Sequence, residues 1–361
     1  MGESYIMKRT VLKTITAASL VLAGAGTATA DTFRLTIGAG HPADAAIWIT
    51  TMRDFLAPEI AKRVEQKTGH KIEWVNAYGG SVCKLGECLE AVESGLVDIA
   101  DLHVAFEPTK LMAHNFPYFV PFGTPDPVVA ATAARKVYDS VPELKKILET
   151  KYNQVFLGVG AVGNYNMLTT FAWDKVEQLK GRKVAAAGPN IPWLQAVGSI
   201  PVQSNLNEAY TSFQTGVYDG WIMFPDATVG FKLHEVAKNY TFTDFGAIAN
   251  VLITINKDTW KKLPKAVQDI MLEVGKEYTA VESKAALEKG LKSVEIMKAA
   301  GSTVRSLSDA EKAKWANALP DIPNQRTAEI NKAGQPGQAV GAYIKALKEA
   351  GVKLPRDWKI K

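Results

Sequence analysis

One glycine and four polar residues stand where three predicted strands end, in the first third of the chain. They are His41, Gly80, Ser81, Asp101 and His103. Because ligands bind at the carboxyl edge of a parallel sheet, imidazole, hydroxyl and carboxylate groups at that edge could hydrogen-bond a polar solute. For the two histidines and the aspartate, a role in a ligand cleft and a role in an ordinary loop are equally compatible with the sequence. The paired glycines at 79–80 would let the backbone approach a ligand closely.

Recognised catalytic motifs do not occur in the sequence in a suitable context. No G-x-S-x-G, H-E-x-x-H or Walker A pattern stands between the elements that such a motif requires. The glycine-rich run at 158–163 follows a predicted strand, but no helix with a ribose-binding acid comes after it. The sequence therefore favours a binding protein over an enzyme, and we expect no cofactor and no metal site.

Cys83 and Cys88 are the only two cysteines of the chain. In an oxidising compartment such a pair favours a disulfide. On a continuous helix, however, residues five apart lie about 8 Å apart, which is too far for a bridge. A disulfide therefore requires a non-helical chain near Leu85 and Gly86, and the alternative of two free thiols stays open. A zinc site that includes these cysteines is disfavoured because the histidines are scattered along the sequence.

Residues 1–30 have the pattern of a secretory signal peptide. Lys8, Arg9 and Lys13 precede an apolar stretch that ends in small residues at 28–30, which predicts cleavage after Ala30. The apolar stretch is shorter than the roughly 20 residues of a membrane span, so a membrane anchor is the weaker alternative. We therefore expect an exported, periplasmic protein. The chain carries 42 basic and 37 acidic residues, a balance too even for a protein that binds nucleic acid through bulk charge.

One phrase of the sequence occurs twice, as AVESGLVDIADLH at 91–103 and as TSFQTGVYDGWIMF at 211–224. Gly95 and Gly216 stand where a helix ends, since glycine enters the left-handed cap without a steric penalty. The apolar runs that follow predict strands buried on both faces. Because strands and helices alternate around both copies, the sequence predicts an α/β fold of two lobes, each with a mixed sheet and flanking helices.

Two further features concern helices. The stretch from Pro264 to Ala300 is rich in Ala, Glu, Lys and Leu, which predicts one long helix or two helices end to end. At 1.5 Å per residue it would span about 50 Å and could lie across both lobes. Pro58 should interrupt an earlier helix that ends near Gly69.

Several segments together resemble one protein family. They are LKGRKVAAAG, AVGSIPVQ, EAYTSFQTGVYDG, FKLHEVAKNYT and TINKDTWKKLPKAVQDIM. Over residues 31–355 the chain resembles the extracytoplasmic solute-binding subunits of tripartite ATP-independent periplasmic (TRAP) transporters, of the C4-dicarboxylate-binding type. The resemblance implies a type II-like periplasmic-binding-protein fold, in which a long helix bridges two lobes and a small organic acid is trapped in the cleft. It also implies a membrane permease as partner.

Two positions depart from the pattern that the resemblance implies. Members of the family typically carry an arginine in the strand after LKG, where this chain has Ala185. A second arginine, often found in the preceding strand, is replaced by Tyr165. Each charge-assisted hydrogen bond to a carboxylate contributes about 1.5 to 3 kcal/mol. The cleft must therefore recover this affinity elsewhere or bind a less charged solute.

Aromatic residues near the implied cleft offer one way to recover it. They are Tyr165, Trp193, Tyr210, Trp221 and Phe224. Stacking against such rings, at about 25 cal/mol per Å² of buried apolar area, could offset a lost ion pair. This predicts a ligand with an aromatic or hydrophobic body, although burial in the core is the alternative for the two tryptophans. Gly188 and Asn190 precede a helix start whose backbone N–H groups could cradle an anion.

We predict that lobe 1 comprises residues 31–157 and 244–285, and that lobe 2 comprises residues 158–243 and 286–361. The segments that cross between them should form a hinge, so that ligand binding favours closure. We expect a monomer. The alternative function is a solute-binding subunit of another uptake or sensing system, with a neutral or weakly charged ligand.

Overall fold

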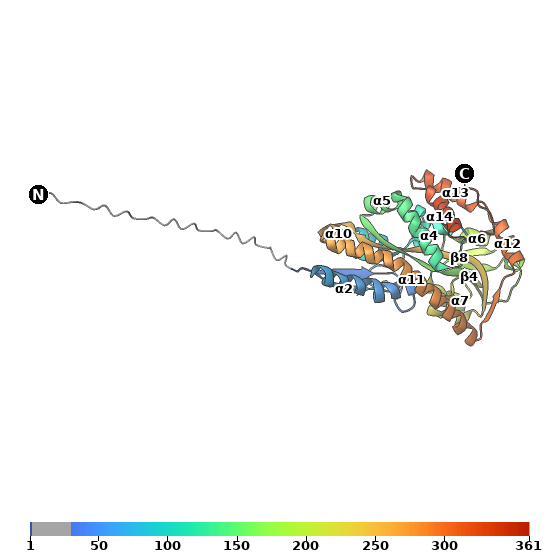
Figure 1. Ribbon diagram of the computed structural model, residues 1–361. Helices are drawn as coiled ribbons and strands as arrows, with labels where there is room; N and C mark the ends of the chain where they lie inside the picture. The colour runs from blue at the N-terminus through green and yellow to red at the C-terminus, as the bar shows by residue number, and fades with distance from the viewer. Residues whose placement is uncertain (2–29, 361) are drawn as a thin grey trace.

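The computed structural model describes residue 1 and residues 30–360, so the predicted signal peptide lies almost wholly outside the described residues. The chain folds around one mixed sheet of nine strands (Figure 1). The strands are β1 (Thr32–Gly38), β2 (Lys71–Ala77), β3 (Ile99–His103), β4 (Gln154–Thr169), β5 (Lys183–Ala186), β6 (Ile200–Gln203), β7 (Gly220–Met223), β8 (Asn239–Asn256) and β9 (Thr303–Ser306).

Helices flank this sheet, and none of the described helices is both long and apolar enough to traverse a bilayer. The α-helices are α1 (Ile47–Thr51), α2 (Ala57–Thr68), α3 (Cys88–Glu93), α4 (Pro127–Ser140), α5 (Pro142–Lys151), α6 (Ile191–Gln195), α7 (Leu206–Gln214), α8 (Pro225–Gly230), α9 (Leu233–Val236), α10 (Lys257–Lys262), α11 (Lys265–Ala299), α12 (Asp309–Ala318), α13 (Ile322–Lys332) and α14 (Gln338–Glu349). The π-helix is η1 (Met52–Leu56), and the 3-10 helices are η2 (Val104–Phe106), η3 (Met112–Phe119) and η4 (Val176–Leu179).

The two longest strands, β4 and β8, pair antiparallel in the middle of the sheet. Toward one edge β8 pairs with β3, and the parallel strands β1 and β2 follow. Toward the other edge β4 pairs with β7, and the parallel strands β5 and β6 follow, while β9 pairs with β8. The strands around the two copies of the repeated phrase thus form two halves of one continuous sheet, joined through β4 and β8.

The two copies of the repeated phrase occupy equivalent places in these halves. The first copy forms β3, beside β8, and the second forms β7, beside β4. Gly95 and Gly216 have φ angles of +77° and +70°, which confirms the predicted glycine caps. Every residue of β3 and β7 is buried, as predicted for strands that are covered on both faces.

The predicted long helix is α11, which contacts α2, α4 and α8 as well as β4 (Figure 1). Its contact with β4 is very close, because a Cβ on Gly275 would lie 2.6 Å from the carbonyl oxygen of Leu157. Only glycine permits this approach of helix to strand. Since α2 flanks the β1 half of the sheet and α8 follows β7, α11 bridges both halves, as predicted.

The earlier helix is interrupted near Pro58, as the sequence predicted. The π-helix η1 joins α1 to α2, and Pro58 stands in the first turn of α2. A proline is tolerated there because that turn lacks intrahelical partners for its N–H groups. On α1, this arrangement places the fully buried Trp48 in the core.

The C-terminal helix α14 packs against α4 and η3, and it lies beside α4 in Figure 1. Nothing in these contacts tests the predicted lobe boundaries, which stay a prediction.

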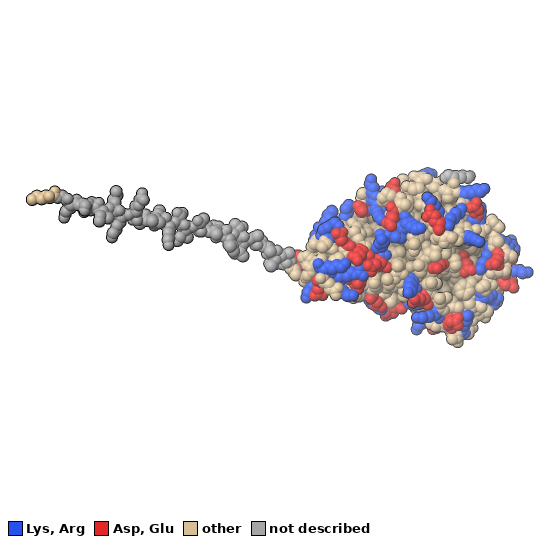
Figure 2. Space-filling view, in the orientation of Figure 1, with Lys and Arg blue, Asp and Glu red and all other residues tan. Residues whose placement is uncertain are grey.

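Acidic and basic side chains are interspersed over the face seen in Figure 2. Among the ion pairs, Arg63 of α2 pairs with Glu59, Glu273 and Glu277.

Candidate functional site

A small cavity lies between the two halves of the sheet, with a volume of about 20 Å³. This is room for roughly one water molecule. It is lined by His41, His103, Phe106, Tyr165, Ala187, Ser204, Asn205, Leu206, Trp221, Met223 and Phe224. The five lining residues predicted from the sequence are the two histidines, the tyrosine, the tryptophan and Phe224.

Short connections after the parallel strands bring these side chains together. His41 follows β1 and His103 ends β3, whereas Ala187, Ser204 and Phe224 follow β5, β6 and β7. Both halves of the sheet therefore present their carboxyl edges to the same cavity, which is where open α/β sheets bind ligands.

A cluster of buried polar groups lies on the β1 and β3 side of the cavity; its two histidines line the cavity, whereas Asp101, a predicted ligand-binding residue, does not. The cluster consists of His41, Asp101 and His103, which are 1%, 3% and 8% exposed. Burial lowers the pKa of His41 to about 4, and burial together with the nearby His41 lowers the pKa of His103. Burial raises the pKa of Asp101 to about 8. The indole of Trp48 offsets this rise in part, although its N–H does not complete a hydrogen bond.

A chain of hydrogen bonds links His103 to Tyr165, both of which line the cavity. Nε2 of His103 lies 2.9 Å from Nδ2 of Asn250, which lies 2.7 Å from the hydroxyl of Tyr118. That hydroxyl lies 3.0 Å from the hydroxyl of Tyr165. Because η3, β4 and β8 all contribute to this chain, it fixes the orientation of His103 and Tyr165 in the cavity wall.

Aromatic rings form much of the remaining wall. The ring of Phe224 meets Tyr165 edge to face at a centroid distance of 5.1 Å and meets Trp48 at 5.9 Å. Trp221 is 1% exposed, and its indole N–H has no hydrogen-bond partner. No lysine or arginine is among the described residues that line the cavity. The wall thus offers apolar faces and neutral donors, without a cationic side chain.

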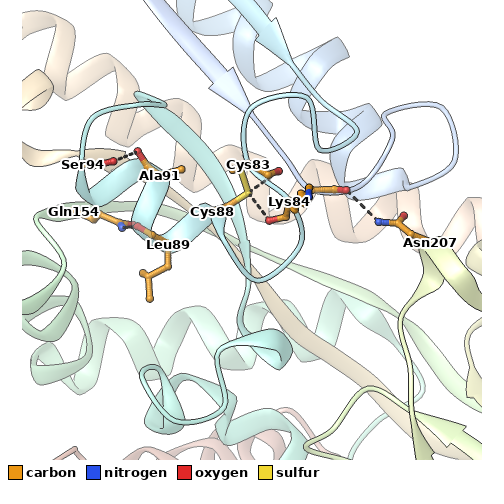
Figure 3. The surroundings of a disulfide bond; sticks show 9 residues. Cys83, Lys84, Cys88, Leu89, Ala91, Ser94, Gln154 and Asn207 are labelled. Atoms are coloured by element: carbon orange, nitrogen blue, oxygen red, sulfur yellow. Dashed lines mark hydrogen bonds between the residues drawn. A yellow bond between two sulfur atoms is a disulfide. The ribbon is translucent and has the colours of Figure 1, made fainter.

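The disulfide loop supports the polar side of the cavity. Cys83 and Cys88 are joined by a disulfide with a Cα–Cα distance of 5.0 Å (Figure 3). Gly86 has a φ of +80° and α3 begins only at Cys88, so the chain near Leu85 and Gly86 is non-helical, as the disulfide requires. The loop packs directly on the chain beside His41, because a Cβ on Gly40 would lie 2.5 Å from the backbone nitrogen of Leu85.

One contact next to this loop crosses between the halves of the sheet. The side-chain amide of Asn207, on α7, donates to the carbonyl of Gly40 at 3.5 Å, and Figure 3 shows Asn207 directed toward the disulfide loop. Since α7 follows β6 and Gly40 follows β1, the structure shows the two cavity walls in contact at this point.

Some predicted ligand-binding residues lie outside the cavity. Ala185 is buried within β5 opposite Trp221, and Ala187, two residues nearer the carboxyl end of the strand, lines the cavity in its place. Gly80 donates its N–H to the carbonyl of Ala39, and the neighbouring Ser81 is exposed to solvent.

Several donors of the predicted anion cradle already form hydrogen bonds within the protein. The N–H of Ala187 donates to Oδ1 of Asn190, and the N–H groups of Ile191 and Trp193 donate to carbonyls of the same turn, which includes Gly188. These donors are therefore already used.

Trp193 and Tyr210 also face other parts of the molecule. Trp193 packs on Phe245 at 5.3 Å, and its carbonyl accepts the indole N–H of Trp315, so it belongs to the core. The hydroxyl of Tyr210 donates to Glu235 on α9. The prediction that these two rings contact the ligand finds no support in this geometry.

Sequence reasoning missed several residues of the site. Ser204 and Asn205 follow β6 directly, so the rule that was applied to the other strand ends would have found them. Trp48 and Asn250 carry no such signal, because each lies within a regular element and approaches the cavity only through the packing of α1 and β8.

The chain matches a family model along most of its length. The model for bacterial extracellular solute-binding proteins of family 7, DctP, matches residues 50–327. The C4-dicarboxylate-binding periplasmic protein DctP of Rhodobacter capsulatus is 30% identical over 138 residues, which cover 38% of this chain and 41% of that protein. The alignment thus spans less than half the length of that relative.

Solved structures of TRAP solute-binding proteins share the fold. One from a marine metagenome, specific for aromatic acid ligands and crystallised with 3-hydroxybenzoate, is 18% identical with a TM-score of 0.77 and covers 89% of this chain and 99% of its own. One from Bordetella bronchiseptica with bound mandelate is 20% identical with a TM-score of 0.76 and covers 88% and 99%. The matched family consists of solute-binding proteins, in agreement with the expectation that this chain is not an enzyme. The chain belongs to bacterial extracellular solute-binding protein family 7, the family to which the sequence resemblance pointed.

Proposed function

We propose that this chain is the solute-binding subunit of a TRAP transporter and that it captures a small organic acid with an aromatic or hydrophobic body. The observation that carries the proposal is the cavity wall, which is lined by Tyr165 of β4, Trp221 of β7 and Phe224, directly after β7. Ring faces of this kind bind apolar ligand bodies through buried area and edge-to-face contacts. The structural neighbours crystallised with mandelate and with 3-hydroxybenzoate support this choice of ligand class.

Capture requires the two halves to separate. A cavity of about 20 Å³ is far smaller than the roughly 300 Å³ or more of ordinary ligand pockets. Opening would break the contact between Asn207 and Gly40, and it would bend β4 and β8, which continue through both halves. The proposed hinge lies in these strands, near 155–160 and 243–250. A ligand held from both sides favours the closed state, because only that state makes all of its contacts.

The proposal also covers the cellular location of the protein and its partner. Membership in an extracellular solute-binding family and the signal-like residues 1–30 support a periplasmic location, with delivery of the solute to a TRAP membrane permease. We propose that it acts as a monomer, since each chain contains a complete cavity.

A thermal-shift panel tests the ligand class. Purified protein is heated with 1 mM mandelate, 3-hydroxybenzoate, D-glucuronate or succinate. A ligand present at a hundred times its Kd stabilises a protein by about 2.7 kcal/mol, which corresponds to a rise in Tm of several degrees for a chain of this size. We expect such a rise with an aromatic acid and none with succinate. A clear preference for succinate would refute the aromatic ligand.

A neutral ligand is the second candidate, because the described lining lacks a cationic side chain. The matched pair of benzoate and benzamide separates the two, since they share a ring and differ in charge. Preferential stabilisation by benzamide would favour a solute-binding subunit of another uptake or sensing system.

A further inference from the structure

Three buried side chains beside the ligand cavity are arranged as a metal site. Asp101 and His103 are two residues apart on β3, so their side chains lie on the same face of the strand. His41 comes from the loop after the neighbouring strand β1. One potential ligand atom from each residue lies within 4.8 Å of the others, and all three side chains are buried.

Four polar atoms of this cluster form no hydrogen bond with another described residue. Both ring nitrogens of His41, Nδ1 of His103 and Oδ1 of Asp101 are buried and have no hydrogen-bond partner among the described residues. Buried polar atoms are rarely left unpaired, and each such atom costs about 1 to 3 kcal/mol. Four of them at one point indicate that a further group satisfies them together.

The surroundings of His103 suit a ligand role. Its Nε2 lies 2.9 Å from the side-chain amide of Asn250, whose Oδ1 lacks a partner. When that amide presents Oδ1 to the ring, Nε2–H and the hydroxyl of Tyr118 can both donate to it. The proton of the neutral imidazole is then held on Nε2, and the lone pair of Nδ1 points to the cluster. Metal-binding histidines are commonly oriented by such a second hydrogen bond.

The ligand types select a class of cation. Two imidazoles and one carboxylate suit zinc, cobalt, nickel, copper or ferrous iron, whereas magnesium and calcium prefer oxygen ligands alone. Three protein ligands leave at least one coordination position open. A divalent cation with one carboxylate retains a net charge of +1, and the described residues that line the cavity include no lysine or arginine.

We propose that His41, Asp101 and His103 bind a divalent transition-metal cation, and that the carboxylate of the captured acid occupies an open position on this cation. Because His41 and His103 also line the ligand cavity, the cation would face the solute. It would supply the positive charge that the described lining lacks. The second half of this inference rests on the proposed function, whereas the first half stands without it.

Binding of the metal alone tests the first half. Tag-free protein is dialysed against EDTA and titrated with ZnCl₂ by calorimetry and with CoCl₂ by visible absorption. We expect one equivalent of metal per chain, with at least tenfold weaker binding after Asp101→Asn, which preserves the shape of the side chain, and after His41→Gln. The matched control is His70→Ala, at a partly exposed histidine that accepts the N–H of Asp31 far from the cluster. No stoichiometric binding, or equal binding in the Asp101→Asn protein, would overturn the site.

Mandelate binding with 1 mM EDTA or with one equivalent of zinc tests the second half. We expect zinc to tighten binding of the acid at least tenfold in the wild type and to have no effect in Asp101→Asn. Equal affinity under both conditions would overturn the metal bridge and leave the proposed function intact. Metal binding without affinity for any acid of the panel would instead support the site and count against the proposed ligand class.

Discussion

Removal of the Cys83–Cys88 disulfide should weaken both the fold and the wall of the ligand cavity. The bridge closes a loop with a sequence separation of 5. Both cysteines are buried, at 1% and 5% exposure, and the loop between them lies against Gly40, next to His41. Loss of the disulfide therefore loosens a segment that supports the polar side of the ligand cavity.

The expected loss of stability follows from the length of the loop. In the chain-entropy model, closing a loop of five residues lowers the entropy of the unfolded chain enough to stabilise the native state by about 2 kcal/mol. A separate effect acts on the native state, because without the bridge the loop beside Gly40 gains freedom that ligand binding must remove. We expect a threefold to tenfold loss of affinity for the preferred acid.

The assay compares wild type with the double variant Cys83→Ser, Cys88→Ser. Urea denaturation measures the free energy of unfolding, and calorimetry measures the Kd of the acid that gives the largest thermal shift. Treatment of the double variant with a thiol reductant is the control, since it should change neither quantity. A free energy of unfolding within about 0.5 kcal/mol of wild type, together with an unchanged Kd, would refute this account of the loop.

Three further predictions follow from the same structure. Gly275→Ala should destabilise the protein by about 1 to 3 kcal/mol, because the Cβ would lie 2.6 Å from the carbonyl oxygen of Leu157. Gly290→Ala, on the same helix with open space around it, should be neutral or stabilising in the same urea denaturation assay. Equal effects of the two substitutions would contradict the close packing of α11 on β4. Burial raises the pKa of Asp226 from 3.8 to about 7, partly offset by Lys289. The folded state thus holds a proton that the unfolded state releases. The contribution of Asp226 to the free energy of unfolding is therefore full below about pH 4 and is lost as the pH rises to about 7. At about 1.4 kcal/mol per pH unit the loss is at most about 4 kcal/mol, and Asp226→Asn should remove this slope between pH 4 and pH 7; an unchanged slope would contradict it. Phe224→Leu should weaken mandelate binding by about 0.5 to 1.5 kcal/mol through loss of ring contacts, measured by calorimetry with Tyr210→Phe as the unaffected control.

Local signals in the sequence were sufficient for most of the fold. The caps at Gly95 and Gly216, the interruption near Pro58 and the long helix from Lys265 to Ala299 each depend on the backbone preference or hydrophobic pattern of a few neighbouring residues. The strand-end rule also placed His41 and His103 in the cavity, because in parallel sheets chain direction alone decides which end of a strand carries the ligand.

Only the tertiary structure decided which of the candidate side chains meet. Trp193 of α6 and Trp221 of β7 are equally apolar, yet the first packs into the core against Phe245 and the second lines the cavity. In the same way, the sequence showed the histidines as scattered, and it took the pairing of β1 with β3 to bring His41 to His103 and Asp101. Sequence separation carries no information about such contacts, because they arise from the register of strands and the packing of helices far apart along the chain.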